Sequence, residues 1–135
     1  MTRQPKESRH MPSRERVEAF VALVEQARYV EALEEFYHPH ASMQDNQRPP
    51  RLGRDRLVAD ERATMARFAR MKTDPVSDLL IDDDKVVVRW RFTFTPAEGP
   101  PIVMEEVALQ RWEGERIAEE RFFYDPAQTR PAAAS

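Results

Sequence analysis

The sequence of 135 residues contains no cysteine, which excludes disulfide bonds, thiolate metal sites and cysteine nucleophiles. It has no apolar run near the roughly 18 residues that a membrane-spanning helix requires, so no membrane contact is expected. Basic residues do not outnumber acidic ones, since the net charge is −3, and we therefore expect no nucleic-acid partner. The polar start of the chain lacks the apolar segment of a secretion signal, and a cytoplasmic location is expected.

Hydrophobic residues make up 41% of the chain and charged residues 33%, which is typical of one globular domain with a heavily charged surface. We expect a single folded unit at residues 13–126, because no repeat, linker or low-complexity tract interrupts it. The polar residues 1–12 are predicted to form a flexible N-terminal arm, and residues 127–135 a flexible tail.

Three helices are predicted in the first half of the chain. The first follows Ser13, a favourable N-cap, and has an apolar stripe at helical spacing: Val17, Phe20, Val21 and Val24. The second is shorter, ends before Pro39 and carries Leu33, Phe36 and Tyr37. The third begins at Gly53, where a helix start needs an unhindered backbone, and is expected to run to about Lys72.

The second half of the chain alternates apolar and polar residues with a period of two. This pattern predicts four strands, at residues 76–81, 85–95, 102–112 and 116–124. The intervening segments DDD, PAEGPP and EGE suit turns. Helices followed by an antiparallel meander predict an α+β fold, in which a curved sheet buries one face against the helices.

The extended segment expected at residues 41–47 carries the best candidate for a catalytic residue. Ala41, Met43 and Asp45 share one face of it, so the carboxylate of Asp45 is expected to point inward. In an apolar cavity a carboxyl group becomes a usable general base near neutral pH, because desolvation disfavours its charged form. The alternative is that Asp45 accepts hydrogen bonds from the loop at residues 47–51 or pairs with a nearby arginine.

Three segments, EEFYHPHASMQD, RLGRD and GERIAEERFFYDP, follow one another within residues 14–126. They resemble the entry to the first strand, the turn into the third helix and the closing strand of the nuclear transport factor 2-like superfamily. Within it, the chain is similar to SnoaL-like polyketide cyclases, ketosteroid isomerases and limonene epoxide hydrolase. The resemblance implies a cone-shaped α+β fold, with three N-terminal helices on a strongly curved, mostly antiparallel sheet that encloses a pocket. It also implies a homodimer formed through the outer face of the sheet.

The resemblance places Asp45 at the position of the base of the isomerases. The two donors that hold the oxyanion in those enzymes correspond to Phe20 and Ala108, and neither side chain donates a hydrogen bond, which argues against steroid isomerisation. The Arg-x-Asp pair of the epoxide hydrolases corresponds to Arg91 and the two residues after it, where the acid is missing. The SnoaL-like cyclases use an acid/base carboxylate in a mostly apolar cavity, and this chain could meet that looser requirement.

Further substrate-binding residues are expected on the third helix and on the strand at residues 85–95. Glu61 interrupts the apolar stripe of that helix, and either reaches the pocket or lies at the edge of the stripe and extends to water. Trp90 lies on the apolar face of the strand and is expected to form a wall of the pocket. Arg91 lies on the opposite face, and a bulge would be needed to turn it into the pocket.

The strand at residues 102–112 has two faces that are too alike for the pattern to choose between them. One carries Glu106, Ala108, Gln110 and Trp112, and the other Glu105, Val107, Leu109 and Arg111. The family resemblance turns the first face inward, so that Glu106 and Gln110 orient a polar ligand. The pocket wall is expected to be completed by Tyr37, Phe122 and Tyr124.

His38 and His40 lie two residues apart and could share a metal ion, but no motif places a third ligand. Two solvated histidines in a loop are the simpler interpretation, and we expect neither a metal nor a cofactor.

These observations predict a homodimer that binds a small apolar organic molecule and isomerises, cyclises or hydrates it, with Asp45 as the general base. The alternative is a non-catalytic module on the same fold, used for ligand binding, dimerisation or assembly.

Overall fold

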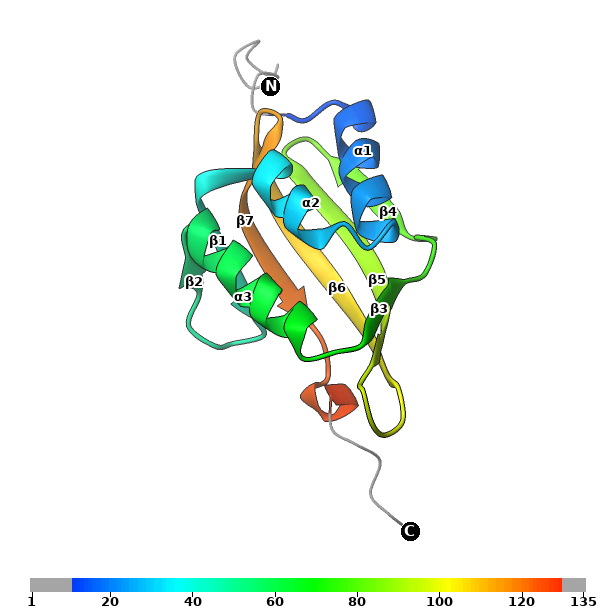
Figure 1. Cartoon of the computed structure of the whole chain (residues 1–135). Coiled ribbons are helices and arrows are strands. Elements are labelled where there is room, and N and C mark those ends of the chain that lie inside the picture. Colours follow the sequence, from blue (N-terminus) through cyan, green and yellow to red (C-terminus); the bar gives the residue numbers. More distant parts are fainter. Residues whose placement is uncertain (1–10, 130–135) are drawn as a thin grey trace, which may run out of the picture.

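The computed structural model of the protein describes residues 11–129, so most of the predicted N-terminal arm and tail lies outside the described residues. Within them, three helices cover one face of a seven-stranded sheet (Figure 1). The helices are α1 (Arg14–Glu25), α2 (Tyr29–Phe36) and α3 (Arg54–Ala66). The predicted α+β architecture is therefore confirmed.

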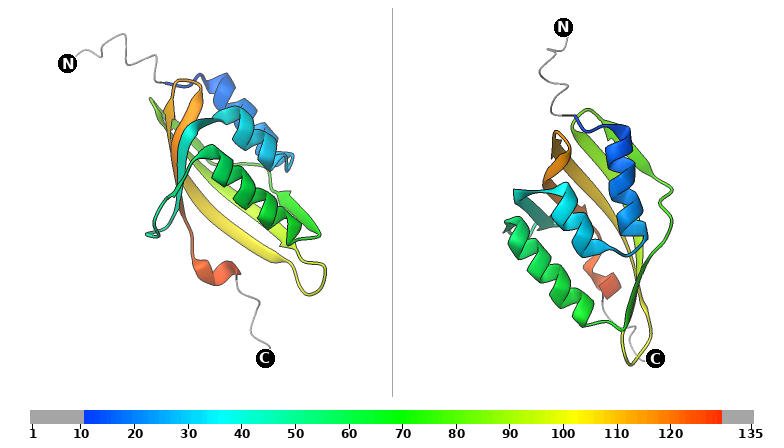
Figure 2. Two further views of the ribbon diagram at one scale, coloured as in Figure 1. Left: turned by 60° about the vertical axis from the view of Figure 1, so that its left-hand side comes forward. Right: turned by 45° about the horizontal axis from the view of Figure 1, so that its top comes forward.

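The sheet runs in the order β2-β1-β7-β6-β5-β3, and β4 pairs with β5 beyond the end of β3. Its strands are β1 (Tyr37–Asp45), β2 (Arg51–Leu52), β3 (Arg70–Thr73), β4 (Leu79–Asp82), β5 (Lys85–Thr95), β6 (Ile102–Glu113) and β7 (Arg116–Phe123). β1 and β7 are parallel, and the other neighbouring strands are antiparallel. The sheet curves around the helices without closing on itself (Figure 2).

The first helix forms as its sequence predicts. The Ser13 hydroxyl accepts a hydrogen bond from the backbone N–H of Arg16 at 3.1 Å, which caps the first turn of α1. The apolar stripe of this helix is buried along its whole length: Val17, Phe20, Val21 and Val24. None of the helices among residues 11–129 is both long and apolar enough to cross a lipid bilayer.

The second and third helices are shorter than predicted. Tyr37 is not helical but begins β1, so the extended segment starts four residues before Ala41 and ends at Asp45. α3 ends at Ala66, and the last residues of the predicted helix, 70–72, belong to β3 instead. α3 buries only one residue, Leu57, so a longer helix would gain little stabilisation from packing. As a strand, the same segment forms a complete ladder of pairs with residues 92–95 of β5.

Some strand boundaries also differ from those predicted by the alternation of apolar and polar residues. The predicted strand at residues 76–81 is β4, which begins only at Leu79, and β7 ends at Phe123. The folded part extends past Pro126, because Pro126–Thr129 form a short 3-10 helix. Its Gln128 side chain bonds the backbone of Glu105 twice, at 2.9 Å each, so residues 127–129 belong to the domain rather than to the tail.

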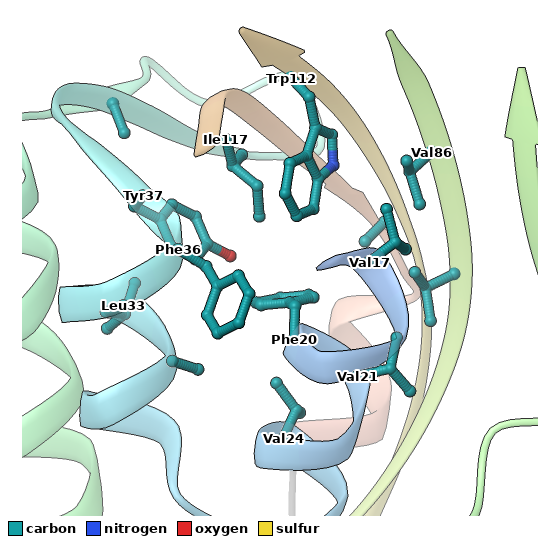
Figure 3. Packing of buried hydrophobic residues seen from close by; sticks show 14 of the residues in the cluster. Val17, Phe20, Val21, Val24, Leu33, Phe36, Tyr37, Val86, Trp112 and Ile117 are labelled. Carbon is teal, nitrogen blue, oxygen red and sulfur yellow. The ribbon is translucent and has the colours of Figure 1, made fainter. Parts of the chain in front are cut away.

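The ring of Phe20 lies at the centre of the hydrophobic core (Figure 3). It makes edge-to-face contacts, with centroid distances of 5.6 to 6.2 Å, to four other rings: Phe36, Tyr37, Trp90 and Trp112. These rings belong to α2, β1, β5 and β6, so one side chain of α1 connects the helices to both halves of the sheet.

We expect Gly53→Ala to lower the free energy of unfolding by about 1 kcal/mol or more. Gly53 precedes α3 with φ of 95°, a conformation that residues with a side chain rarely adopt, while the space that a Cβ would occupy is open. The loss therefore comes from backbone strain rather than from a clash. Denaturant unfolding measures it, and an unchanged or higher free energy of unfolding would contradict this explanation.

Candidate functional site

A cavity of about 390 Å³ lies between the helices and the inner face of the sheet. Aromatic side chains make up much of its wall: Phe20, Tyr29, Phe68, Trp90, Phe92, Phe94 and Phe122. Carboxyl groups also reach it, from three strands and one helix: Asp45, Asp60, Glu61, Glu106 and Glu120. A mostly apolar chamber with a few convergent polar groups has the usual composition of a small-molecule site.

Asp45, the last residue of β1, lines this cavity. Strand alternation accounts for its direction, since Ala41 is fully buried on the same face and Met43 also lines the cavity. Its carboxylate accepts hydrogen bonds from Arg51 Nη2 at 3.1 Å and from the Tyr124 hydroxyl at 3.3 Å. The side chain is 28% exposed, so Asp45 faces the cavity and is also paired within the protein.

Glu106 of β6 is a buried carboxyl group of the cavity whose charged neighbours are all acidic. It is 8% exposed, and within residues 11–129 its carboxyl group takes part in no hydrogen bond. Burial, followed by the negative charges of Glu120, Asp45 and Glu61, raises the pKa of Glu106 to about 8. Glu106 therefore carries a proton at neutral pH and presents a hydrogen-bond donor to the cavity.

The structure shows which face of β6 is turned towards the helices. Glu106, Ala108, Gln110 and Trp112 point inward, whereas Val107 and Leu109 are exposed on the outer face. Gln110 is fully buried but does not line the cavity. Its amide nitrogen donates to Glu120 at 2.6 Å, and its oxygen accepts from Trp112 Nε1 at 3.0 Å. Gln110 thus holds Glu120 in place instead of contacting a ligand.

Glu120 of β7 is the site residue that the sequence reasoning missed. It lines the cavity, is almost wholly buried, and accepts hydrogen bonds from the Tyr37 hydroxyl and from Gln110. Burial raises the pKa of Glu120 to about 7, and the two hydrogen bonds oppose that rise. The period of two could have revealed it, because Phe122 and Tyr124 were expected to point inward and Glu120 precedes Phe122 by two residues.

Arg91 does not reach the cavity, contrary to its expected role in substrate binding. It lies exposed on the outer face of β5, where it pairs with Asp74 at 2.9 Å and with Glu105 at 3.5 Å. β5 and β6 keep one register from Lys85 to Phe94, so no bulge turns the side chain inward.

The other expected pocket residues line the cavity: Tyr37, Glu61, Trp90, Phe122 and Tyr124. Glu61 is therefore at the pocket rather than at a solvated edge of α3. Burial raises the pKa of Glu61, and the nearby charge of Arg51 partly opposes the rise. Phe20 lies at the cavity wall and Ala108 is fully buried, and neither side chain donates a hydrogen bond.

Comparisons with known proteins agree with this architecture. The family model of the SnoaL-like domain matches residues 17–120. A search of curated proteins finds no match to the chain. Among solved structures, a SnoaL-like polyketide cyclase candidate from Jannaschia sp. CCS1 is similar at 19% identity and a TM-score of 0.73, covering 100% of this chain and 99% of that one.

Two further structures share the fold. An NTF2-like protein of unknown function from Burkholderia pseudomallei is 16% identical with a TM-score of 0.71, over 84% of this chain and 91% of that one. A protein with a ketosteroid isomerase-like fold from Catenulispora acidiphila, in complex with trimethylamine, is 18% identical with a TM-score of 0.71, over 86% and 89% of the two chains. At these identities the likeness shows the fold alone.

The raised pKa of Glu106 predicts that the protein loses stability as the pH rises. Between its ordinary value of 4.5 and about 8, Glu106 is protonated in the folded state and ionised in the unfolded state, so the folded state binds more protons. Stability then falls with pH across this window, by about 1.4 kcal/mol for each unit of difference in pKa. Glu106→Gln should flatten the fall, as measured by melting temperature at about pH 5 and about pH 9.

Glu105→Gln is the matched control, because Glu105 is the neighbouring residue on the outer face of β6. It should keep the slope of the unmodified protein. If the melting temperature falls equally in Glu106→Gln and in the unmodified protein, Glu106 is ionised in the folded state over this whole pH range, and the explanation is wrong.

Proposed function

The chain belongs to the SnoaL-like domain family, and we propose that it is an enzyme that transfers a proton on a small, largely apolar molecule. Asp45 acts as the general base, and Glu106 donates a hydrogen bond to an oxygen atom of the substrate. The reaction class is isomerisation, cyclisation or hydration, each of which begins with removal of a proton from carbon or from water.

One observation carries this proposal: two carboxyl groups in the same cavity have opposite environments. Asp45 forms an ion pair with the guanidinium of Arg51, whose Nη2 atom lies 3.1 Å from Asp45 Oδ2. Glu106 has no such partner and holds its proton, since its pKa is about 8. An ion-paired carboxyl group and a buried, protonated one in the same cavity can supply a base and an acid.

The geometry of the cavity supports a defined sequence of events. A substrate oxygen accepts a hydrogen bond from Glu106, and Asp45 takes the proton from the adjacent carbon. The electron pair of the broken C–H bond moves towards the oxygen, where the Glu106 proton stabilises the developing negative charge. Tyr124 donates to one oxygen of Asp45 and Arg51 to the other, so both partners orient the base, while free lone pairs remain on the carboxylate.

Hydrogen–deuterium exchange tests the proposal without knowledge of the natural substrate. β-Tetralone, a small bicyclic ketone, has acidic protons next to its carbonyl group, and NMR follows their exchange in deuterated water. We expect the protein to accelerate this exchange, and Asp45→Asn to slow the catalysed rate about a hundredfold or more. Glu106→Gln keeps a donor in place and should remove the loss of rate above about pH 8 that the unmodified protein shows.

Asp60→Asn is the matched control for this experiment. Asp60 lies on α3 and also pairs with Arg51, at 3.2 Å, so its loss frees the same guanidinium without removing the proposed base. Exchange should fall by no more than a few-fold. An equal loss for Asp60→Asn and Asp45→Asn would show that the charge of Arg51, rather than a base at Asp45, governs the rate.

A second candidate function is ligand binding without catalysis, and the pairing of Asp45 favours it. Both carboxylate oxygens of Asp45 already accept hydrogen bonds from the protein, as a purely structural acid would. This candidate predicts that β-tetralone raises the melting temperature of the protein and of Asp45→Asn equally, with exchange at the rate of the buffer alone. The open cavity argues against a pure assembly module, in which the core would be filled.

We also propose a homodimer that forms through the outer face of the sheet, as the family resemblance implies. Apolar side chains are adjacent there in the strand registers, where Leu80 is opposite Val87 and Val87 is opposite Leu109. In the neighbouring row, Val107 is opposite Phe123. Such a continuous apolar area on the outside of a sheet is typical of a protein interface.

The cytoplasmic location also stays a prediction, which cell fractionation would check.

Leu109→Glu is expected to convert the dimer into a monomer, because it places a charge in the middle of the apolar area. Light scattering after size-exclusion chromatography measures the mass. Leu52→Glu changes another exposed leucine, on β2 and away from this area, and should leave the dimer intact. A monomeric unmodified protein, or a dimeric Leu109→Glu variant, would rule out this interface.

A further inference from the structure

Outside the cavity, three potential metal ligands meet where β1 begins and β6 ends: His38, His40 and Glu113. We propose that they form a binding site for a divalent transition-metal ion such as Zn²⁺. The inference is independent of the proposed function, because none of the three residues lines the cavity.

An irregularity in β1 brings the two histidines together. The parallel pairing of β1 with β7 shifts register between Tyr37 and Ser42, and Pro39 within this stretch has no N–H for the ladder. The rings of His38 and His40 stack with centroids 4.9 Å apart and an interplanar angle of 15°. Both imidazoles therefore face the end of the β6–β7 hairpin, where Glu113 lies.

The distances suit a tetrahedral ion. Glu113 Oε2 is 3.7 Å from His38 Nε2 and 3.6 Å from His40 Nε2, and the three ligand atoms lie within 4.8 Å of one another. With metal–ligand bonds near 2.0 to 2.1 Å, the atoms of a tetrahedral site are roughly 3.4 Å apart. The two distances to Glu113 are close to that spacing. A small rotation of the exposed His40 side chain would bring its ligand nitrogen closer to that of His38.

A hydrogen bond already orients the carboxylate of Glu113. Arg111 Nη1 donates to its Oε1 atom at 3.0 Å, so Oε2 is the oxygen that faces the two imidazoles. The positive charge of Arg111 is shared with Glu119, whose carboxylate accepts a second bond at 3.2 Å. Partners of this kind fix the direction of a ligand in established metal sites.

The chemistry of the ligands selects the ion. Two imidazole nitrogens and one carboxylate oxygen suit Zn²⁺ and its neighbours among the transition metals, with water in the fourth position, whereas Ca²⁺ and Mg²⁺ prefer oxygen ligands alone. His38 Nε2 donates to the backbone oxygen of Glu113 at 3.0 Å. Metal binding exchanges this hydrogen bond for a metal–nitrogen bond and moves the remaining ring proton to Nδ1.

The ion would join β1 to the β6–β7 hairpin across the stretch where the β1–β7 ladder is irregular. Binding to the folded state alone stabilises it, so the melting temperature should rise with Zn²⁺ concentration. This rise gives a readout that needs no enzyme assay.

Isothermal titration of the full chain with Zn²⁺ tests the site. We expect one ion per chain, and about tenfold or greater loss of affinity in His40→Ala and in Glu113→Gln. The His40 side chain is 67% exposed, so its removal leaves the fold intact, which circular dichroism verifies. The rise in melting temperature with Zn²⁺ should disappear in both variants.

Two controls make the result decisive. Glu119→Gln removes the other carboxylate partner of Arg111 without removing a ligand, and should bind Zn²⁺ as the unmodified protein does. His10→Ala should also bind normally, because His10 is the remaining histidine of the chain and lies outside the described residues. Absence of Zn²⁺ binding, or affinity that falls in His10→Ala and not in His40→Ala, would overturn the proposal.

Discussion

The arrangement of helices and sheet depends on the contacts of one aromatic ring, that of Phe20. It touches rings from α2, β1, β5 and β6, so it determines how closely α1 approaches the sheet and where the chain leaves α2. The contact with Tyr37 matters most for the site, because the same side chain donates its hydroxyl hydrogen to Glu120. Phe20 belongs to the hydrophobic core and also lines the cavity, so it connects the packing of the core to the site.

Desolvation governs the chemistry of that cavity. Several carboxyl groups share a mostly apolar space, and ionising all of them would be costly, since their charges repel one another and lack water. The protein resolves this conflict differently at each position. Asp45 has the guanidinium of Arg51, Glu120 has two hydrogen-bond donors, and Glu106 keeps its proton. Three similar side chains thereby acquire distinct surroundings, on which the proposed acid–base chemistry rests.

The fold was largely predictable because local signals and tertiary packing agree in most elements. The cap at Ser13, the apolar stripe of α1 and the alternation of β5 each identify their element without help from distant residues. Local signals failed where long-range pairing competes with them. Residues 70–72 were predicted to continue the third helix but belong to β3, because β5 offers their backbone groups a ladder of hydrogen bonds. The two faces of β6 have nearly the same composition, so only the position of the helices decides which one is buried.

The sequence by itself determined that Asp45 points inward, because alternation along a strand depends only on neighbouring residues. It also indicated the aromatic walls and the absence of donors at positions 20 and 108. The tertiary structure alone decided that Arg51 and Tyr124 hold Asp45, that Glu120 joins the site, and that Arg91 stays outside. Glu113 likewise comes beside two histidines more than 70 residues earlier in the chain. The physical reason is the same in each case: pairing of distant strands sets which side chains meet, and no local pattern encodes that pairing.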